Sequence, residues 1–425
     1  MAERCNLVMD EIEVVMPGRE SLYRSALDEA FAGASPREPL LFLSGGSQHG
    51  AFGAGYLDEW SRSPGGLPPF RLVTGVSAGA LQSTAAFIGD TDMLLETAEI
   101  SGEGRILDAF VPGRSVRDGF TLGSLWSLAR RGAVSDLVPL RERMQERLTD
   151  DVLARVAEGY AGNRRLFVGV TDVDTGRAAA VDLTELAHRY TQDPVGNAHL
   201  KTCYHEVLIA SSVVPIAAKP VFLDGRMYID GGVRFAVFAE DIRKRLPDLP
   251  DLPPSPPPPG DGPVITPVSR KAPYVHIVLN GDGEPSTRCG KADDADCLDG
   301  RTPRPGHEDA PHESWDIADL AARSVSLLTN QVARLSVERA VKLEGREEGD
   351  VAFARIDEAE KDAHMMHPDA LRFAALRPDD GLGARSCAEW RKIDEAVDDP
   401  VEFHPRYMHC LVSYGRTLAK ARFNP

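Results

Sequence analysis

The sequence predicts an α/β fold with a mostly parallel central sheet flanked by helices. Two successive segments, residues 40–60 and 70–87, each begin with a short apolar run, pass through glycines and continue as a helix-competent stretch. Farther along the 425-residue chain, strand-like apolar runs keep alternating with stretches of helical periodicity. Parallel strands need long crossover connections, which are usually helices, so this alternation is typical of a parallel sheet covered on both faces.

Residues 38–283 are expected to form the main domain, preceded by a peripheral N-terminal segment over residues 1–37. Within that first segment, residues 21–31 carry apolar side chains at helical spacing. Helices of the main domain are predicted at 91–100, at 121–131 as an amphipathic stretch with a basic end, at 138–156 and at 207–212. Its further strands are predicted at 165–172, at 178–183 after a glycine turn, in a hairpin over 221–229 and at 274–279.

A proline-rich stretch at 247–273 interrupts the main domain. Polyproline lacks N–H donors, so this stretch is expected to be a solvated surface insertion and neither sheet nor helix. Residues 284–425 are expected to add a loop excursion and a mainly helical part packed on the same domain. Its elements are predicted as helices at 315–343 and 406–423 and a strand at 351–356.

The chain is acidic, with 48 Lys and Arg against 65 Asp and Glu and a net charge of −17. This balance argues against a nucleic-acid partner and against attachment to anionic lipid by charge alone. Insertion of apolar groups into a membrane surface needs no positive charge and stays open. No apolar run approaches the roughly 20 residues of a spanning helix, and the first residues show no signal-peptide core.

Six cysteines are present. Cys289 and Cys297 flank a polar loop, which has no apolar core in which a free thiol could be buried. The sequence therefore favours a small disulfide-closed loop, with Cys387–Cys410 as a second bridge, and with it a periplasmic, secreted or membrane-peripheral location. The alternative is buried or idle thiols in a cytosolic protein. No Cys-x-x-Cys pattern suggests zinc and no Gly-Lys-Ser/Thr ending suggests a nucleotide, so neither a metal nor a cofactor is expected.

Three glycine-containing motifs carry the candidate chemistry. Gly75-Val76-Ser77-Ala78-Gly79, between a strand and a helix, has the pattern of a nucleophile elbow. The run from Ser44 to Gly50 leads into a helix N-terminus, whose free N–H groups suit an anion. A serine hydroxyl needs a base, and Asp230, followed by two glycines directly after a predicted strand, is the strongest candidate.

These three motifs resemble the signature blocks of the patatin-like phospholipases, and they occur in the order of that family. Residues 210–215 also resemble the family's helix that ends in proline before the aspartate block. The resemblance covers about residues 38–283. It implies a patatin-like three-layer architecture and lipid acyl-ester hydrolysis of the phospholipase A or lysophospholipase type. It also implies a Ser-Asp dyad that uses neither histidine nor metal.

Carried over to this sequence, the resemblance makes Ser77 the nucleophile and Asp230 the base. The N–H groups of Gly45, Gly46 and Ser47 would form the oxyanion hole, and the remaining motif glycines are Gly50, Gly75, Gly79, Gly231 and Gly232. The chain departs from the family pattern at Ser47, where a third glycine is usual, and at His49, where another basic residue is common. The lipid or ester substrate is expected at a membrane or micelle surface, with aromatic candidates for its acyl chain at Phe110, Phe120, Trp126 and Phe222.

Two other readings stay open from the sequence. An α/β-hydrolase with a Ser-Asp-His triad would draw its histidine from the downstream set His276, His307, His312, His367, His404 and His409. A non-catalytic lipid- or partner-binding protein on this scaffold would use the proline insertion for docking.

Overall fold

The structure is a computed structural model that describes most of the central part of the chain. The described residues are 4–7, 9–11, 22–31, 38–98, 108–109, 133–237, 275–281, 317–341, 351–356, 363–364, 385–397 and 403–423. The helix predicted at 121–131, the proline-rich stretch at 247–273 and the loop carrying Cys289 and Cys297 lie outside these residues.

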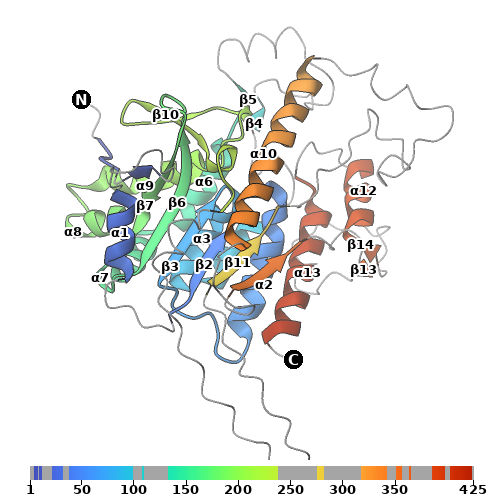
Figure 1. The fold of residues 1–425 in the computed structure, drawn as a ribbon, viewed down its shortest axis with the longest axis horizontal. Helices are drawn as coiled ribbons and strands as arrows, with labels where there is room; N and C mark the ends of the chain where they lie inside the picture. Colours follow the sequence, from blue (N-terminus) through green and yellow to red (C-terminus); the bar gives the residue numbers. More distant parts are fainter. Residues whose placement is uncertain are drawn as a thin grey trace, which may run out of the picture.

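Nine strands of the described chain form the central sheet, and five neighbouring ones are parallel (Figure 1). In order across the sheet, the parallel strands are β6 (Arg165–Asp172), β3 (Leu72–Val76), β2 (Leu40–Leu43), β11 (Val275–Leu279) and β12 (Val351–Arg355). The β6 edge is extended by β7 (Arg177–Asp182) and β1 (Met9–Glu11), and β9 (Val221–Leu223) and β10 (Arg226–Asp230) form a hairpin on β6. The prediction of a mostly parallel sheet is confirmed.

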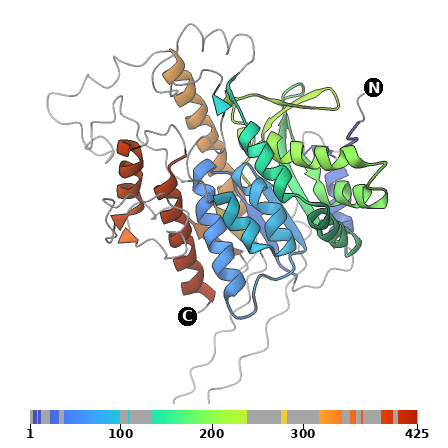
Figure 2. The same cartoon turned by 180° about the vertical axis from the view of Figure 1, so that it is seen from behind.

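Side chains of each central strand alternate between two apolar layers. On β2, Leu41 and Leu43 join one buried cluster, whereas Leu40 and Phe42 join the other. The first cluster is covered by helices that include α2 (Gly50–Arg62), α3 (Ala78–Ile88), α4 (Thr91–Ala98), α7 (Asp150–Ala161), α8 (Leu183–Gln192), α9 (Ala198–Ala210) and α13 (Pro405–Phe423). The second is covered by α1 (Leu22–Phe31) and α10 (Ile317–Val341). Figures 1 and 2 show these two helix layers from opposite sides, which makes a three-layer α/β fold.

The single helix predicted at 138–156 is wrong, because the chain forms two helices there. The first, α6 (Val138–Arg147), ends before Leu148. Thr149 is extended and its hydroxyl accepts a hydrogen bond from the N–H of Val152, which caps the N-terminus of α7. Apolar periodicity continues across this break, so the pattern alone did not reveal it. The hairpin at 221–229 and the strand at 165–172 are confirmed.

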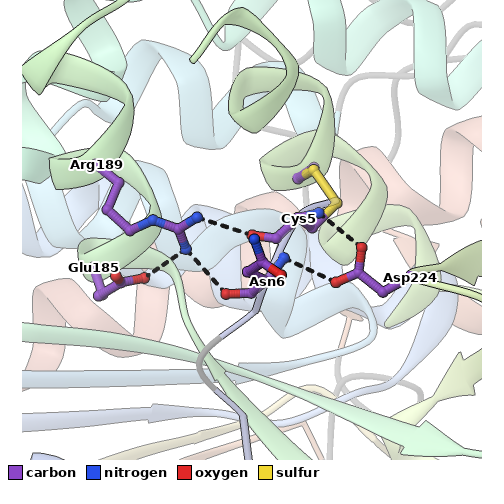
Figure 3. The surroundings of a disulfide bond; sticks show 6 residues. Cys5, Asn6, Glu185, Arg189 and Asp224 are labelled. Carbon is purple, nitrogen blue, oxygen red and sulfur yellow. Dashed lines mark hydrogen bonds and ion pairs between the residues drawn. A yellow bond between two sulfur atoms is a disulfide. The ribbon is translucent and has the colours of Figure 1, made fainter. Parts of the chain in front are cut away.

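The N-terminal segment is tied to the main domain by a disulfide and a clamp of charged side chains (Figure 3). Cys5 is bonded to Cys203 of α9. The backbone N–H groups of Cys5 and Asn6 donate to the carboxylate of Asp224 at 2.7 and 2.9 Å. Their carbonyl oxygens accept from the guanidinium of Arg189 at 3.2 and 3.0 Å. All four backbone groups of this dipeptide are thus satisfied, and β1 continues the sheet from there.

The C-terminal region packs α13 along α2, as the two views of the ribbon show (Figures 1 and 2). A buried ion pair of 2.7 Å joins Arg416 of α13 to Asp58 of α2. A disulfide links Cys410 of α13 to Cys387, the first residue of α12 (Cys387–Val397), as the sequence predicts. No helix within the described ranges is both long and apolar enough to cross a membrane.

Candidate active site

Strand β6 sets the distance between the two candidate catalytic residues. Its first half pairs with β3, up to Val76 opposite Gly169. Its last three residues pair with the antiparallel β10, whose last residue, Asp230, lies opposite Val170, one position after the pairing with β3 ends. Ser77 follows Val76 directly. The register therefore brings Ser77 and Asp230, 153 positions apart in the sequence, to adjoining points on one strand.

Ser77 lies at a tight turn between β3 and α3. Its backbone has φ 54° and ψ −124°, a conformation that residues with a side chain rarely adopt. The motif glycines make the turn possible: a Cβ on Gly75 would lie 2.5 Å from the carbonyl oxygen of Gly79, and one on Gly79 would lie 2.4 Å from that of Leu43. The turn at Ser77 thus has the strained, tightly packed backbone that the pentapeptide predicts for an elbow.

Asp230 lies close to Ser77, whose side chain favours the charged form of the Asp230 carboxylate. This carboxylate accepts a hydrogen bond of 2.7 Å from the N–H of Gly232, and the exposed fraction of Asp230 is only 6%. Burial raises the pKa of Asp230 to about 7, and the interactions with Ser77 and Gly232 oppose this shift without cancelling it. Gly231 must lack a Cβ, since one would lie 2.5 Å from the carbonyl oxygen of Gly169. Burial thus makes the Asp230 carboxylate more basic than an exposed aspartate.

The glycine loop between β2 and α2 lies directly against the elbow. A Cβ on Gly45 would lie 3.0 Å from the Cβ and 3.8 Å from the Oγ of Ser77. Among the described residues, no acceptor takes the N–H groups of Gly45, Gly46 and Ser47. Ser47 has φ 49°, the left-handed conformation in which glycine is free of strain. Gly50 is packed against the elbow too, because its Cβ would lie 2.9 Å from that of Ala78.

Side chains from distant parts of the chain support this loop. The oxygen of the Gln48 side chain accepts a hydrogen bond of 3.1 Å from the backbone N–H of His404, next to α13. Asn280, directly after β11, bonds Ser44 and Gly53. Asn280 lies outside the three motifs, and no local pattern links it to them. Gln48 belongs to the predicted glycine loop, but its bond to His404 depends on long-range packing.

The histidines of the triad alternative are spread over the molecule. His276 lies near the start of β11, at the opposite end of the sheet from Ser77, with its ring 4.6 Å from that of Trp60. His404 contacts Gln48, and His409 is buried in α13, where burial lowers its pKa to about 4. Across the described ranges, no histidine bonds Ser77 or Asp230. His307, His312 and His367 lie outside these ranges.

Of the aromatic candidates for the acyl chain, only Phe222 is described. It lies on β9 and is 64% exposed, so it does not line a buried tunnel. Phe110, Phe120 and Trp126 lie outside the described residues. Within the described ranges, no three side chains among His, Cys, Asp and Glu come together in a way that could hold a metal ion.

Residues 41–242 match the family model described as patatin-like phospholipase. This range contains the glycine loop, the elbow and Asp230, and it ends before Asn280 and His404. A search of curated proteins found no match.

Proposed function

Residues 41–242 are a patatin-like phospholipase domain, and we propose that the chain hydrolyses lipid acyl esters through a Ser77–Asp230 dyad. Lipid acyl hydrolysis is the activity of this family. The observation that supports the dyad most directly is the register along β6, which places Asp230 beside the turn that carries Ser77. A buried carboxylate whose pKa is raised to about 7 is matched to taking a proton from a hydroxyl at neutral pH.

In the first step, Asp230 takes the Ser77 proton as Oγ attacks the ester carbonyl. The carbonyl oxygen becomes an oxyanion, and the N–H groups of Gly45, Gly46 and Ser47 are the proposed donors to it. Loss of one such donor costs about 2.7–4 kcal/mol of transition-state stabilisation in known cases. The protonated Asp230 then gives its proton to the leaving alcohol, which leaves an acyl group on Oγ.

In the second step, Asp230, again ionised, takes a proton from water as that water attacks the acyl carbonyl. The same donors hold the second oxyanion. Collapse of this intermediate breaks the bond to Oγ, returns the proton to Ser77 and releases the fatty acid. One carboxylate therefore serves as base and acid in both halves of the reaction, which explains why no histidine is needed.

We further propose that the enzyme works in an oxidising compartment. The Cys5–Cys203 disulfide joins the N-terminal segment to α9 within the matched range, and Cys387–Cys410 joins α12 to α13 after it. Bridges of this kind persist in periplasmic, secreted or surface proteins and are rare in the cytosol. The substrate is expected to be presented at a membrane or micelle surface, in keeping with lipid as the substrate class of the family.

The test is hydrolysis of a short-chain chromogenic ester and of a phospholipid, with and without a chelator, by the intact protein, Ser77→Ala and Asp230→Asn. Both variants should lose at least about 10³-fold in kcat, as when a nucleophile or its base is removed. Matched controls are Ser83→Ala, another buried serine, and Asp182→Asn, another buried aspartate that caps α8. Both controls should keep the activity of the intact protein.

Three outcomes would change the proposal. Activity retained by Asp230→Asn but lost on substitution of a downstream histidine would favour the triad. An intact protein that neither hydrolyses esters nor reacts with a fluorophosphonate at Ser77 would favour a binding role. Hydrolysis of the chromogenic ester without the phospholipid would keep the dyad and shift the substrate to small esters.

A further inference from the structure

We propose that Asn280 is a positioning residue that aims the N–H groups of the oxyanion hole. The inference rests on the proposed hydrolase function. Asn280 lies directly after β11, is fully buried and falls outside the matched range 41–242. Its role would come from holding the backbone of the glycine loop, with no contact to the substrate.

Asn280 holds this loop through three groups: its backbone N–H, its side-chain NH2 and its side-chain oxygen. Its backbone N–H donates to the hydroxyl of Ser44 at 2.9 Å, and its side-chain Nδ2 donates to the carbonyl oxygen of Ser44 at 2.9 Å. Its side-chain Oδ1 accepts from the N–H of Gly53 at 3.1 Å. One buried amide therefore joins the end of β2 to the first turn of α2, the two elements between which the loop is suspended.

The bond to the Ser44 carbonyl fixes the direction of the Gly45 N–H. Both groups belong to the same planar peptide unit, in which C=O and N–H point in opposite directions. Because Asn280 holds the carbonyl on one side of the loop, the N–H is turned to the other side. Gly45 itself packs against the Ser77 side chain, since a Cβ on Gly45 would lie 3.0 Å from the Ser77 Cβ.

The next peptide unit is fixed through the Ser44 hydroxyl. This hydroxyl accepts from the N–H of Asn280 and donates to the carbonyl oxygen of Gly45 at 2.9 Å. The Gly45 carbonyl shares its peptide plane with the N–H of Gly46. Asn280 therefore determines the orientation of two of the three proposed oxyanion donors, one directly and one through Ser44.

Two glycines make this arrangement possible by allowing Asn280 to come close. A Cβ on Gly46 would lie 2.6 Å from the carbonyl carbon of Asn280, and a Cβ on Gly53 would lie 2.4 Å from its Oδ1. Gln82, also buried, donates to the carbonyl oxygen of Gly50 on the same turn of α2. The loop is thus backed by packed polar side chains and has little room to shift.

The experiment compares Asn280→Asp, Asn280→Ala and Ser44→Ala with the intact protein. Asn280→Asp is nearly isosteric, keeps the acceptor for Gly53 and replaces the donor to Ser44 by an oxygen. For each variant, competent sites are counted by titration of Ser77 with a fluorophosphonate, and kcat and KM for a chromogenic ester are expressed per titrated site. The affinity for a trifluoromethyl ketone, which adds to Ser77 reversibly and forms an oxyanion, is also measured. It is compared with the affinity for an uncleavable ether analogue, which binds without forming an oxyanion.

Both Asn280 variants should lose about 10- to 100-fold in kcat per titrated site, because displaced oxyanion donors act on the transition state. KM and the affinity for the ether analogue should stay within about threefold, and the affinity for the ketone should fall with kcat. The pH midpoint should not move, since the base is untouched. Ser44→Ala should lower kcat per titrated site by a smaller factor. It replaces the Asn280 variants as the test if these fail to fold.

Matched controls separate this role from a general loss of stability. Asn197→Asp makes the same chemical change at an amide whose Nδ2 donates to a backbone carbonyl, that of Arg189, at 2.8 Å. Leu153→Ala removes a fully buried side chain on α7. Both should keep kcat per titrated site whatever their effect on Tm.

An unchanged kcat per site in Asn280→Ala, with only fewer competent sites, would overturn the inference and leave the proposed function intact. An intact protein that neither hydrolyses the ester nor reacts with the fluorophosphonate would overturn both.

Discussion

The backbone N–H of Ser77 donates a hydrogen bond of 2.9 Å to the hydroxyl of Ser211. The same hydroxyl donates to the carbonyl oxygen of Gly169 at 2.7 Å, at the position on β6 where the pairing with β3 ends, next to the pair Val170–Asp230. Ser211 thus ties the elbow to the strand that positions Asp230. It also occupies the N–H of Ser77, which is therefore not free to donate to an oxyanion.

We expect Ser211→Ala to lower kcat about tenfold or more. The buried N–H of Ser77 and the buried carbonyl of Gly169 both lose their partner, and the turn at Ser77 is no longer held to β6. The measurement is steady-state hydrolysis per fluorophosphonate-titrated site. Ser212→Ala is the matched control, since the neighbouring hydroxyl bonds only the carbonyl of Leu208 within its own helix turn. Equal kcat values for the two variants would contradict the anchoring role.

The activity should depend on the ionisation of Asp230. Burial raises the pKa of this carboxylate to about 7, so the basic form is scarce below that pH and abundant above it. We expect kcat/KM to rise with pH, with a midpoint near 7, and to level off at higher pH. A midpoint near the ordinary value of 3.8 would mean that the carboxylate is hydrated in the working enzyme.

The same burial should make Asp230 a source of instability at high pH. Between 3.8 and about 7 the folded protein keeps a proton on Asp230 that the unfolded chain has released. Asp230 therefore does not lower the free energy of unfolding below pH 3.8, and it lowers this free energy progressively as pH rises towards 7. Asp230→Asn should gain stability relative to the intact protein between pH 4 and pH 8, by up to about 4 kcal/mol. Urea unfolding at both pH values measures this, and a constant difference would refute it.

Ser47 should be under backbone strain, because its φ of 49° brings Cβ close to the following carbonyl. Ser63, with φ −74°, has no such strain. We therefore expect Ser47→Gly to be more stable than Ser63→Gly by about 1–2 kcal/mol in urea unfolding. A less stable Ser47→Gly would show that contacts of the Ser47 side chain outweigh the strain.

The two disulfides should stabilise the fold by different amounts. Cys5–Cys203 closes a separation of 198 residues and Cys387–Cys410 one of 23. In the chain-entropy account, the longer loop contributes about 5 kcal/mol and the shorter about 3 kcal/mol. Urea unfolding of the paired Cys→Ser variants measures both, and the N-terminal pair should cost more. The reverse order would mean that the unfolded chain keeps the N-terminal segment near α9.

Local patterns were enough to predict the fold class and several elements. Strand 165–172 and the hairpin at 221–229 are confirmed, since apolar runs and turn residues predict them locally, and the Cys387–Cys410 bridge is confirmed too. The catalytic roles of Ser77 and Asp230 stay predictions, although the structure brings the two side chains together. The Cys5–Cys203 bridge was missed, because nothing in the sequence indicates that residues 198 positions apart meet.

The sequence by itself determined which residues are able to form an elbow, a glycine loop and a base, because backbone strain and close approach demand glycine at fixed spacing. Only the tertiary structure decided how they meet. Strand register along β6 sets Asp230 beside Ser77, and buried hydrogen bonds from Asn280 and His404 fix the loop from segments far away in the chain. Such contacts depend on long-range packing, for which a buried asparagine or glutamine carries no local signal.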